Sequence, residues 1–179
     1  SVHALQDLLD GLMDLSKLDA GAIQTHVVPL PLNTIFDQIQ QALAPLAAEK
    51  GLRFRVRPTH QWVHSDPHLL QRILQNLAAN AVRYTERGSV LIACRAPTAS
   101  GHVRIEVWDS GIGIAPEHHG QIFREFFQVG NAQRERAKGL GLGLNIVERT
   151  AGLLSHRFYL RSSLGRGTRF TLEVPVATP

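Results

Sequence analysis

Two asparagines, Asn76 and Asn80, stand four residues apart in a segment that is otherwise largely apolar. This spacing places both amides on one face of a helix. A buried amide costs free energy unless it finds a hydrogen-bonding partner or a ligand. The pair therefore indicates either two amides bonded to neighbouring backbone or a binding site. The apolar neighbours that define the helix are Leu69, Leu70, Ile73, Leu74, Leu77, Ala78, Ala81 and Val82.

The second set of residues that could do chemistry is a carboxylate beside two glycines. Asp109 ends an alternating segment and is followed by Gly111 and Gly113. A carboxylate at a strand end can accept a hydrogen bond from an amino group, and glycines let backbone approach a flat ring closely. An ordinary Asp-Ser-Gly turn would have the same sequence, so this motif by itself is a weak signal.

A third group consists of the alternating glycines Gly139, Gly141 and Gly143, which run directly into an expected helix. Alternating glycines expose backbone N–H groups, and the start of a helix carries partial positive charge, so both favour a phosphate. The pattern is neither a G-x-x-x-x-G-K-(S/T) loop nor a strand-led G-x-G-x-x-G fingerprint. A glycine-rich hinge without a ligand is the alternative.

The elements that must position these groups mix helices and strands. The patterns predict a helix capped by Asn33, kinked or weakened at Pro45, with Leu46 on its buried face. Ser65 or Asp66 should cap the asparagine-bearing helix, and a third helix should run from about 141 to 153. The predicted strands are 23–30, 52–57, 62–64, 89–95, 103–109, 156–161 and 169–174. Mixed elements with hairpins at the end predict an α+β, two-layer sandwich: a mixed sheet covered by helices on one face.

The first residues predict a bundle or coiled-coil helix with leucines spaced by three and four, ending near Gly21. Its seam of Leu5, Leu8, Leu12 and Leu15 has no partner of comparable length nearby. We expect it to pack on another copy of the chain or on a further helix.

Composition narrows the class of function. The chain has 179 residues, 44% of them apolar, and one cysteine, Cys94, which we expect to be a small buried hydrophobe in a reducing compartment. No stretch approaches the roughly 20 apolar residues of a membrane helix, and no signal peptide is visible. The net charge is +4, but the basic residues form no run of five or six. The basic residues cluster between residues 124 and 138, which favours a small phosphate ligand over nucleic acid.

The motifs together resemble the catalytic ATP-binding domain of sensor histidine kinases, which shares a superfamily with gyrase, heat-shock chaperones and mismatch-repair ATPases. Residues 76–85 resemble the N box and 109–114 the G1 box. Residues 122–128 resemble the F box, 139–144 the G2 box and 165–170 the last glycine box, in the family order. The resemblance implies a Bergerat-type ATP-binding fold over residues 22–179, with an ATP lid at about 115–140. Residues 15–21 resemble the end of the second helix of the dimerisation and histidine-phosphotransfer hairpin, so 1–21 is assigned to that helix.

The resemblance also implies roles for individual residues. Asn80 would hold Mg²⁺, and Asn76 stands where ATP-hydrolysing relatives carry a glutamate base. An amide takes no proton at neutral pH, which points to transfer rather than efficient hydrolysis. Arg83 would lie near the phosphates and complete the catalytic set, Tyr84 would lie beside the nucleotide, and Asp109 would bind the exocyclic amine of adenine. The remaining implied nucleotide contacts are Gly111, Gly113, Ile114, Lys138, Gly139, Leu140, Gly141, Leu142, Gly143, Leu144 and Thr168.

Two positions depart from the family pattern. Leu140 replaces a Ser or Thr that many members carry, so phosphate contacts there would need backbone amides, Arg136 or Lys138. No histidine stands in the family's phospho-acceptor context; His118 and His119 fit a solvated loop pair better than a metal site. We therefore expect the acceptor to lie upstream, outside this chain, which would then be a fragment.

The function that follows is transfer of the ATP γ-phosphoryl group to that histidine, with ATP and Mg²⁺ as cofactors and a response regulator receiver domain as the next acceptor. The full-length protein should be a homodimer through the hairpin helices. We expect this segment to be cytoplasmic, with neither nucleic-acid nor membrane contact, although the whole protein could be membrane-anchored. A non-catalytic nucleotide-binding scaffold, an ATPase switch and an anti-sigma-factor-type serine kinase are the alternatives.

Overall fold

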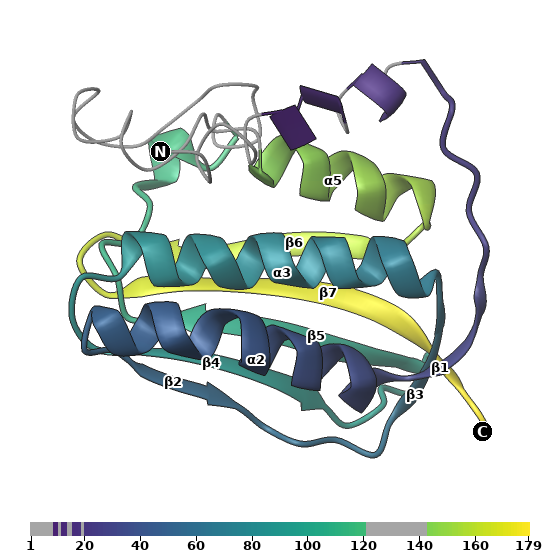
Figure 1. Ribbon diagram of the computed structural model, residues 1–179, viewed down its shortest axis with the longest axis horizontal. Coiled ribbons are helices and arrows are strands. Elements are labelled where there is room, and N and C mark those ends of the chain that lie inside the picture. The colour runs from purple at the N-terminus through teal and green to yellow at the C-terminus, as the bar shows by residue number, and fades with distance from the viewer. Residues whose placement is uncertain (1–8, 11, 14–15, 19, 121–142) are drawn as a thin grey trace.

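The computed structural model describes residues 9–10, 12–13, 16–18, 20–120 and 143–179. Three longer helices and seven strands make up the regular structure of this part of the chain (Figure 1). In order they are β1 (Val28–Pro31), α2 (Leu32–Glu49), β2 (Arg53–Val56), β3 (Trp62–Ser65), α3 (Pro67–Tyr84), β4 (Ser89–Arg95), β5 (His102–Asp109), the single 3-10 turn η1 (Pro116–His118), α5 (Gly143–Leu153), β6 (Arg157–Ser163) and β7 (Gly167–Ala177).

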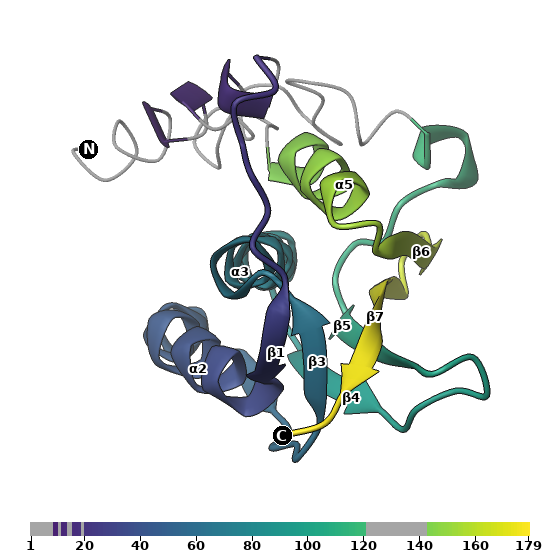
Figure 2. The same ribbon diagram turned by 90° about the vertical axis from the view of Figure 1, so that its right-hand side faces the viewer.

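The strands form one mixed sheet in the order β1-β3-β7-β5-β4-β2, with β6 paired to β7 beside that path. The β2–β4 pair is parallel and the other pairs are antiparallel. Figure 2 shows α2, α3 and α5 on the same side of the sheet. The predicted two-layer α+β sandwich is therefore confirmed.

The helix that carries the asparagines begins as its sequence predicts. Asp66 is the N-cap, and its Oδ1 accepts hydrogen bonds from the N–H groups of His68 and Leu69 at 3.0 Å each. Its Oδ2 accepts from the His26 N–H at 2.8 Å. Burial acts to raise the pKa of Asp66, but these N–H donors outweigh it and lower the pKa below its usual value. The start of α3 is thus fixed to the segment that leads into β1.

Two local expectations around α2 are wrong. The helix begins at Leu32 after the N-cap Pro31, and Asn33 makes no cap: its Oδ1 accepts from the Thr59 N–H at 3.1 Å. The helix continues through Pro45 to Glu49, and Ala47 beyond the proline is fully buried. Leu46 is 49% exposed, since a step of about 100° per residue turns it away from the face that buries Ala47.

Strand ends also differ from the expected ones. The strand expected over 23–30 is reduced to Val28–Pro31, because only these residues pair, with β3. Strands β6 and β7 extend beyond their expected ends to Ser163 and Ala177. Elsewhere the alternation holds: Val103, Ile105 and Val107 of β5 are all buried.

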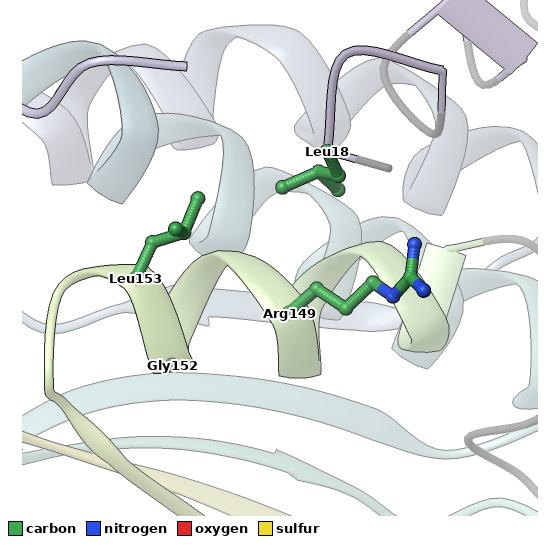
Figure 3. Close-up of a pocket in the computed structure, with 4 residues that line it drawn as sticks. All are labelled: Leu18, Arg149, Gly152 and Leu153. Atoms are coloured by element: carbon green, nitrogen blue, oxygen red, sulfur yellow. The ribbon is translucent and has the colours of Figure 1, made fainter. Parts of the chain in front are cut away.

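The described residues of the 9–18 segment are helical, in agreement with the expected N-terminal helix. Leu18 packs against Ile146 of α5. Figure 3 shows a groove here, where the side chains of Leu18 and Leu153 point toward each other above α5, with Arg149 and Gly152 completing the lining. Leu5, Leu8 and Leu15 of the expected seam lie outside the described residues. Within the described part of the chain, no helix has the length and apolarity needed to cross a bilayer.

Candidate functional site

The C-terminal half of α3 lies next to the start of α5, and this contact brings Asn80 to the second glycine-rich segment. A Cβ atom placed on Gly143 would lie 3.5 Å from Asn80 Nδ2 and 3.9 Å from its Oδ1. Arg83 is one turn further along α3, and its Nη1 donates to Asn80 Oδ1 at 3.5 Å, the outer limit of a hydrogen bond. Asn76, Asn80 and Arg83 are all half-buried. An amide and a guanidinium thus meet the backbone at the first residue of α5.

Asp109 ends β5 on the helix-facing side of the sheet. Its Oδ1 accepts from the Gly111 N–H at 2.9 Å, and the Thr168 N–H also bonds the carboxyl. Burial raises the pKa of Asp109, and the two N–H donors oppose this without cancelling it. The carboxyl is therefore held in place by two backbone N–H groups.

Gly111 passes directly over the end of α3. A Cβ atom on this residue would lie 2.6 Å from the Tyr84 carbonyl oxygen, 3.0 Å from Asp109 Oδ1 and 3.0 Å from Thr85 Oγ1. Tyr84, the last residue of α3, is half-buried. Only glycine lets the loop after β5 approach this helix end without displacing the carboxylate.

The loop of residues 110–114 is fixed to the β6–β7 hairpin by a hydroxyl pair. Ser162 Oγ accepts from the Ile114 N–H at 2.7 Å, and it lies 2.7 Å from Thr168 Oγ1. Gly113 adopts φ +70°, and a Cβ atom there would lie 2.0 Å from the Ser163 carbonyl oxygen. The predicted contacts Asp109, Gly111, Gly113, Ile114 and Thr168 are thus brought together by the ends of β5, β6 and β7.

Sequence reasoning missed two residues of this site. Ser162 carries no local signal, because its role depends on the pairing of β6 with β7. Thr85 is fully buried, and its Oγ1 has no hydrogen-bond partner within the described structure. It directly follows Tyr84 in the N box, so the motif itself contained the signal.

Several predicted residues lie outside the described residues: Lys138, Gly139, Leu140, Gly141 and Leu142, with most of the expected lid and all of the F box. Leu144, in the first turn of α5, packs on the core. His119 Nε2 lies 2.9 Å from the Ile114 carbonyl oxygen. In the part of the chain that the structure describes, no three His, Cys, Asp or Glu side chains gather as a metal site.

The described geometry fits a nucleotide. A fixed carboxylate acceptor, a glycine with no room for a side chain and a buried hydroxyl that has no partner among the described residues lie together at the end of α3. These groups suit a flat ring bearing an amino group. Asn80 and Asn76 lie about one and about two turns of α3 before this end. Asn80 lies beside the start of α5, where backbone N–H groups can bind a phosphate.

Comparison with known proteins agrees with this geometry. The profile of the family described as histidine kinase-, DNA gyrase B- and HSP90-like ATPase matches residues 65–178. A sensor-like histidine kinase of Rhizobium meliloti (strain 1021) is 31% identical over 173 residues, which are 96% of this chain and 33% of that protein. The aerobic respiration control sensor protein ArcB of Escherichia coli (strain K12) is 31% identical over 179 residues, covering 97% of this chain and 23% of ArcB.

Among solved structures, full-length ShkA in complex with AMPPNP superposes with a TM-score of 0.83 at 32% identity, covering 98% of this chain and 36% of ShkA. The chain thus spans about a third or less of the length of these curated relatives. The family match covers more than half of the chain, including the asparagine helix, Asp109 and the hairpin that carries Thr168. The chain therefore belongs to the histidine kinase-, DNA gyrase B- and HSP90-like ATPases, as an ATP-binding catalytic domain of the sensor histidine kinase type.

Proposed function

We propose that this domain binds ATP with Mg²⁺ and transfers the γ-phosphoryl group to a ring nitrogen of a histidine on a helical hairpin of a longer protein. The phosphoryl group would then pass to an aspartate of a response regulator receiver domain. The observation that carries the proposal is the set of Asp109, Gly111 and Thr168 at one end of α3, with an amide at position 76 where a hydrolytic base would stand.

Asp109 would select the base. Its carboxylate accepts a hydrogen bond from the exocyclic amine of adenine, while the Gly111 and Thr168 N–H groups keep it oriented. A base with a carbonyl at that position would bring two acceptors together, which costs free energy. The Thr85 hydroxyl, which lacks a partner within the described structure, can join the same hydrogen-bond network directly or through a water molecule.

Asn80 would hold the metal ion. Its amide oxygen is a hard, neutral ligand of the kind that Mg²⁺ accepts beside phosphate oxygens and water. Bound Mg²⁺ neutralises charge on the phosphates during transfer. Arg83, within 3.5 Å of Asn80, adds a positive charge at the same end of the site. These side chains bind and orient the donor, and the acceptor histidine supplies its own nucleophile.

Asn76 would set the choice between transfer and hydrolysis. Its amide cannot accept a proton from water at neutral pH, so a water molecule in the site remains a poor nucleophile. Phosphoryl transfer therefore waits for an imidazole, which needs no activation by this side chain. We infer that the domain turns over ATP slowly when no hairpin is present.

The proposal extends to the assembly. Leu18 packs on α5, which supports the assignment of residues 1–21 to a helix that continues into the hairpin. In the full-length protein we expect a homodimer formed by the hairpin helices, with this domain in the cytoplasm. The receiver domain is the expected protein partner of the phosphorylated hairpin.

Transfer can be tested by mixing this chain with Mg²⁺, γ-labelled ATP and the separately produced hairpin of the full-length protein. We expect acid-labile, base-stable label on the hairpin, and none on a hairpin whose histidine is replaced by glutamine. Binding of a fluorescent ATP analogue is measured in parallel. Intact nucleotide binding without any labelled hairpin would refute the kinase proposal and favour a nucleotide-binding scaffold.

A further inference from the structure

The sheet has a second face, opposite the helices, and strand register defines it. Ile92 of β4, Val107 of β5 and Phe170 of β7 point into the core. Their sequence neighbours therefore point the other way, to what we call the outer face. Register places these residues on it: Arg53 and Arg55 of β2, Leu91, Ala93 and Arg95 of β4, Arg104, Glu106 and Trp108 of β5, Arg169, Thr171 and Glu173 of β7, and Arg157, Tyr159 and Arg161 of β6.

The outer face concentrates positive charge that is scattered in the sequence. Over β2, β4, β5, β6 and β7 it carries seven arginines, two glutamates and no lysine, an excess of five positive charges. The whole chain has a net charge of +4, so the rest of the molecule carries −1. The basic character of this protein is therefore a property of one sheet face.

Two glutamates organise part of this face. Glu106 is only 2% exposed, and its carboxylate contacts Arg95 Nε at 2.6 Å and Arg169 Nη1 at 3.6 Å. The guanidinium of Arg169 lies over the Trp108 ring, 4.9 Å from its centroid. These contacts hold two guanidinium groups in fixed positions before any partner arrives.

A second cluster repeats the arrangement on β6. Arg157 lies over the Tyr159 ring at 4.9 Å and contacts Glu173 at 3.6 Å. Guanidinium groups that are stacked and paired in this way lose little conformational freedom on binding, which favours affinity.

Some polar side chains of the outer face nevertheless lack partners within the described structure. The buried Nε atoms of Arg104 and Arg169 and the buried Oγ1 of Thr171 have no hydrogen-bond partner within the described structure. Arg53, Arg55 and Arg161 are exposed, and no ion pair joins them to another described residue. The exposed guanidinium groups of Arg53, Arg55 and Arg161 are therefore the donors that this face presents to a partner.

We propose that the outer face docks an acidic protein surface, with the guanidinium groups of Arg55 and Arg161 pairing with carboxylates of the partner. Charge complementarity argues for an anionic partner, and the composition argues for protein. Arg, Trp and Tyr are enriched at protein interfaces, where Lys is depleted. The face carries these three residue types and no lysine.

Nucleic acid fits the same face less well. Bases bind single-strand platforms by stacking on open aromatic rings. Here Trp108 and Tyr159 each already have a guanidinium over the ring. Glu173, whose side chain is partly exposed beside Arg157, also interrupts the positive surface that a continuous phosphate backbone would follow. A protein surface, which carries isolated carboxylates among other groups, matches this pattern.

The test is calorimetric titration of the chain with a short poly-glutamate peptide at physiological salt, in parallel with single-stranded DNA of equal charge. We expect the peptide to bind and the double variant Arg55→Ala/Arg161→Ala to weaken binding about fivefold, the loss expected for two exposed ion pairs. The matched control Arg72→Ala/Arg149→Ala removes the same charge from the helix layer. It should change affinity less than twofold.

Three results would overturn the proposal. One is a peptide that does not bind, and another is an equal loss of affinity in both double variants, which would indicate attraction by net charge alone. The third is DNA that binds more tightly than the peptide and loses affinity only in Arg55→Ala/Arg161→Ala, which would make the face a nucleic-acid surface. Binding of the fluorescent ATP analogue to each variant verifies that the domain remains folded.

Discussion

Replacing Gly111 by alanine tests whether the loop after β5 and the end of α3 must touch for the adenine site to exist. The new Cβ atom would lie 2.6 Å from the Tyr84 carbonyl oxygen, which is 0.8 Å closer than the 3.4 Å at which ordinary contact begins. It would also lie 3.0 Å from Asp109 Oδ1 and from Thr85 Oγ1, 0.4 Å too close in each case. The loop or the helix end must therefore move.

The expected cost follows from these contacts. Overpacking of this kind costs about 1–3 kcal/mol. Displacing the loop also weakens the hydrogen bond from the Gly111 N–H to the Asp109 carboxylate, now 2.9 Å long and worth about 1.5 kcal/mol or more because the acceptor is charged. We expect the free energy of unfolding to fall by about 2–4 kcal/mol. We also expect ATP affinity to fall at least about tenfold, a change of about 1.4 kcal/mol, because the adenine acceptor is displaced.

The free energy of unfolding is measured by urea unfolding followed by circular dichroism. The ATP affinity is measured by titration with a fluorescent ATP analogue. Gly152→Ala is the matched control, since a Cβ atom there meets nothing within 4 Å and the residue lies inside α5. Alanine should stabilise that helix by about 0.5–1 kcal/mol and leave ATP affinity unchanged. Alanine is thus expected to lower the free energy of unfolding at position 111 and to raise it at position 152.

The reasoning would be refuted if Gly111→Ala unfolded at the same urea concentration as the parent and bound the ATP analogue within twofold of it. Loss of stability with unchanged nucleotide affinity would separate the packing argument from the adenine site. In that case the position of the Asp109 carboxylate would not determine binding.

Three further predictions test the site and the fold. Asn80→Ala should abolish the part of ATP affinity that depends on Mg²⁺ and keep the metal-free part; equal affinity with and without Mg²⁺ in the parent would contradict the assigned ligand. ATP affinity should fall as acid protonates Asp109, at a higher pH than for an ordinary aspartate because burial raises its pKa; Asp109→Asn should bind more weakly and lose this acid dependence, as a pH series of titrations would reveal. Burial lowers the pKa of His156 from 6.5 to about 4, so its neutral form stabilises the fold above pH 6.5 and that contribution is lost as the pH falls toward 4. The shift corresponds to about 3 kcal/mol at most, and partial solvation reduces it to about 2 kcal/mol; urea unfolding at several pH values should show this loss in the parent and not in His156→Gln.

The sequence predicted the elements well wherever burial alternates cleanly or a cap is explicit. Strand β4 has the expected ends, and α3 begins at the predicted Asp66 and Pro67. The errors lie where tertiary contacts override local preference. Asn33 has the chemistry of an N-cap, yet its side chain bonds the Thr59 backbone across the chain, a contact that no local pattern contains.

Contacts of the site between residues close in sequence could be predicted, whereas contacts between distant segments could not. The bond from the Gly111 N–H to Asp109 spans two residues, and the motif that predicted it is equally short. Ser162 fixes Ile114 from 48 residues away, and nothing in either segment specifies that distance. Gly143 was predicted as a phosphate contact, but its place beside Asn80 follows only from the packing of α5 on α3.

The positive charge of the outer face also depends on contacts between strands that the sequence does not show, although part of its pattern is visible in the sequence. The sequence contains no run of like charge, because each strand contributes only alternate residues to a face. Phe54 separates Arg53 from Arg55 on β2, and Phe158 and Leu160 alternate with Arg157, Tyr159 and Arg161 on β6; these three apolar residues point to the core side. Period-two spacing of arginines within a predicted strand is visible in the sequence. What the sequence lacked was the strand order that sets β6 beside β7 and β2 beside β4, and the register that puts Leu91, Trp108, Arg169 and Arg161 in one row. Once order and register are known, charge must be counted by sheet face rather than along the chain, and the excess of five positive charges follows directly.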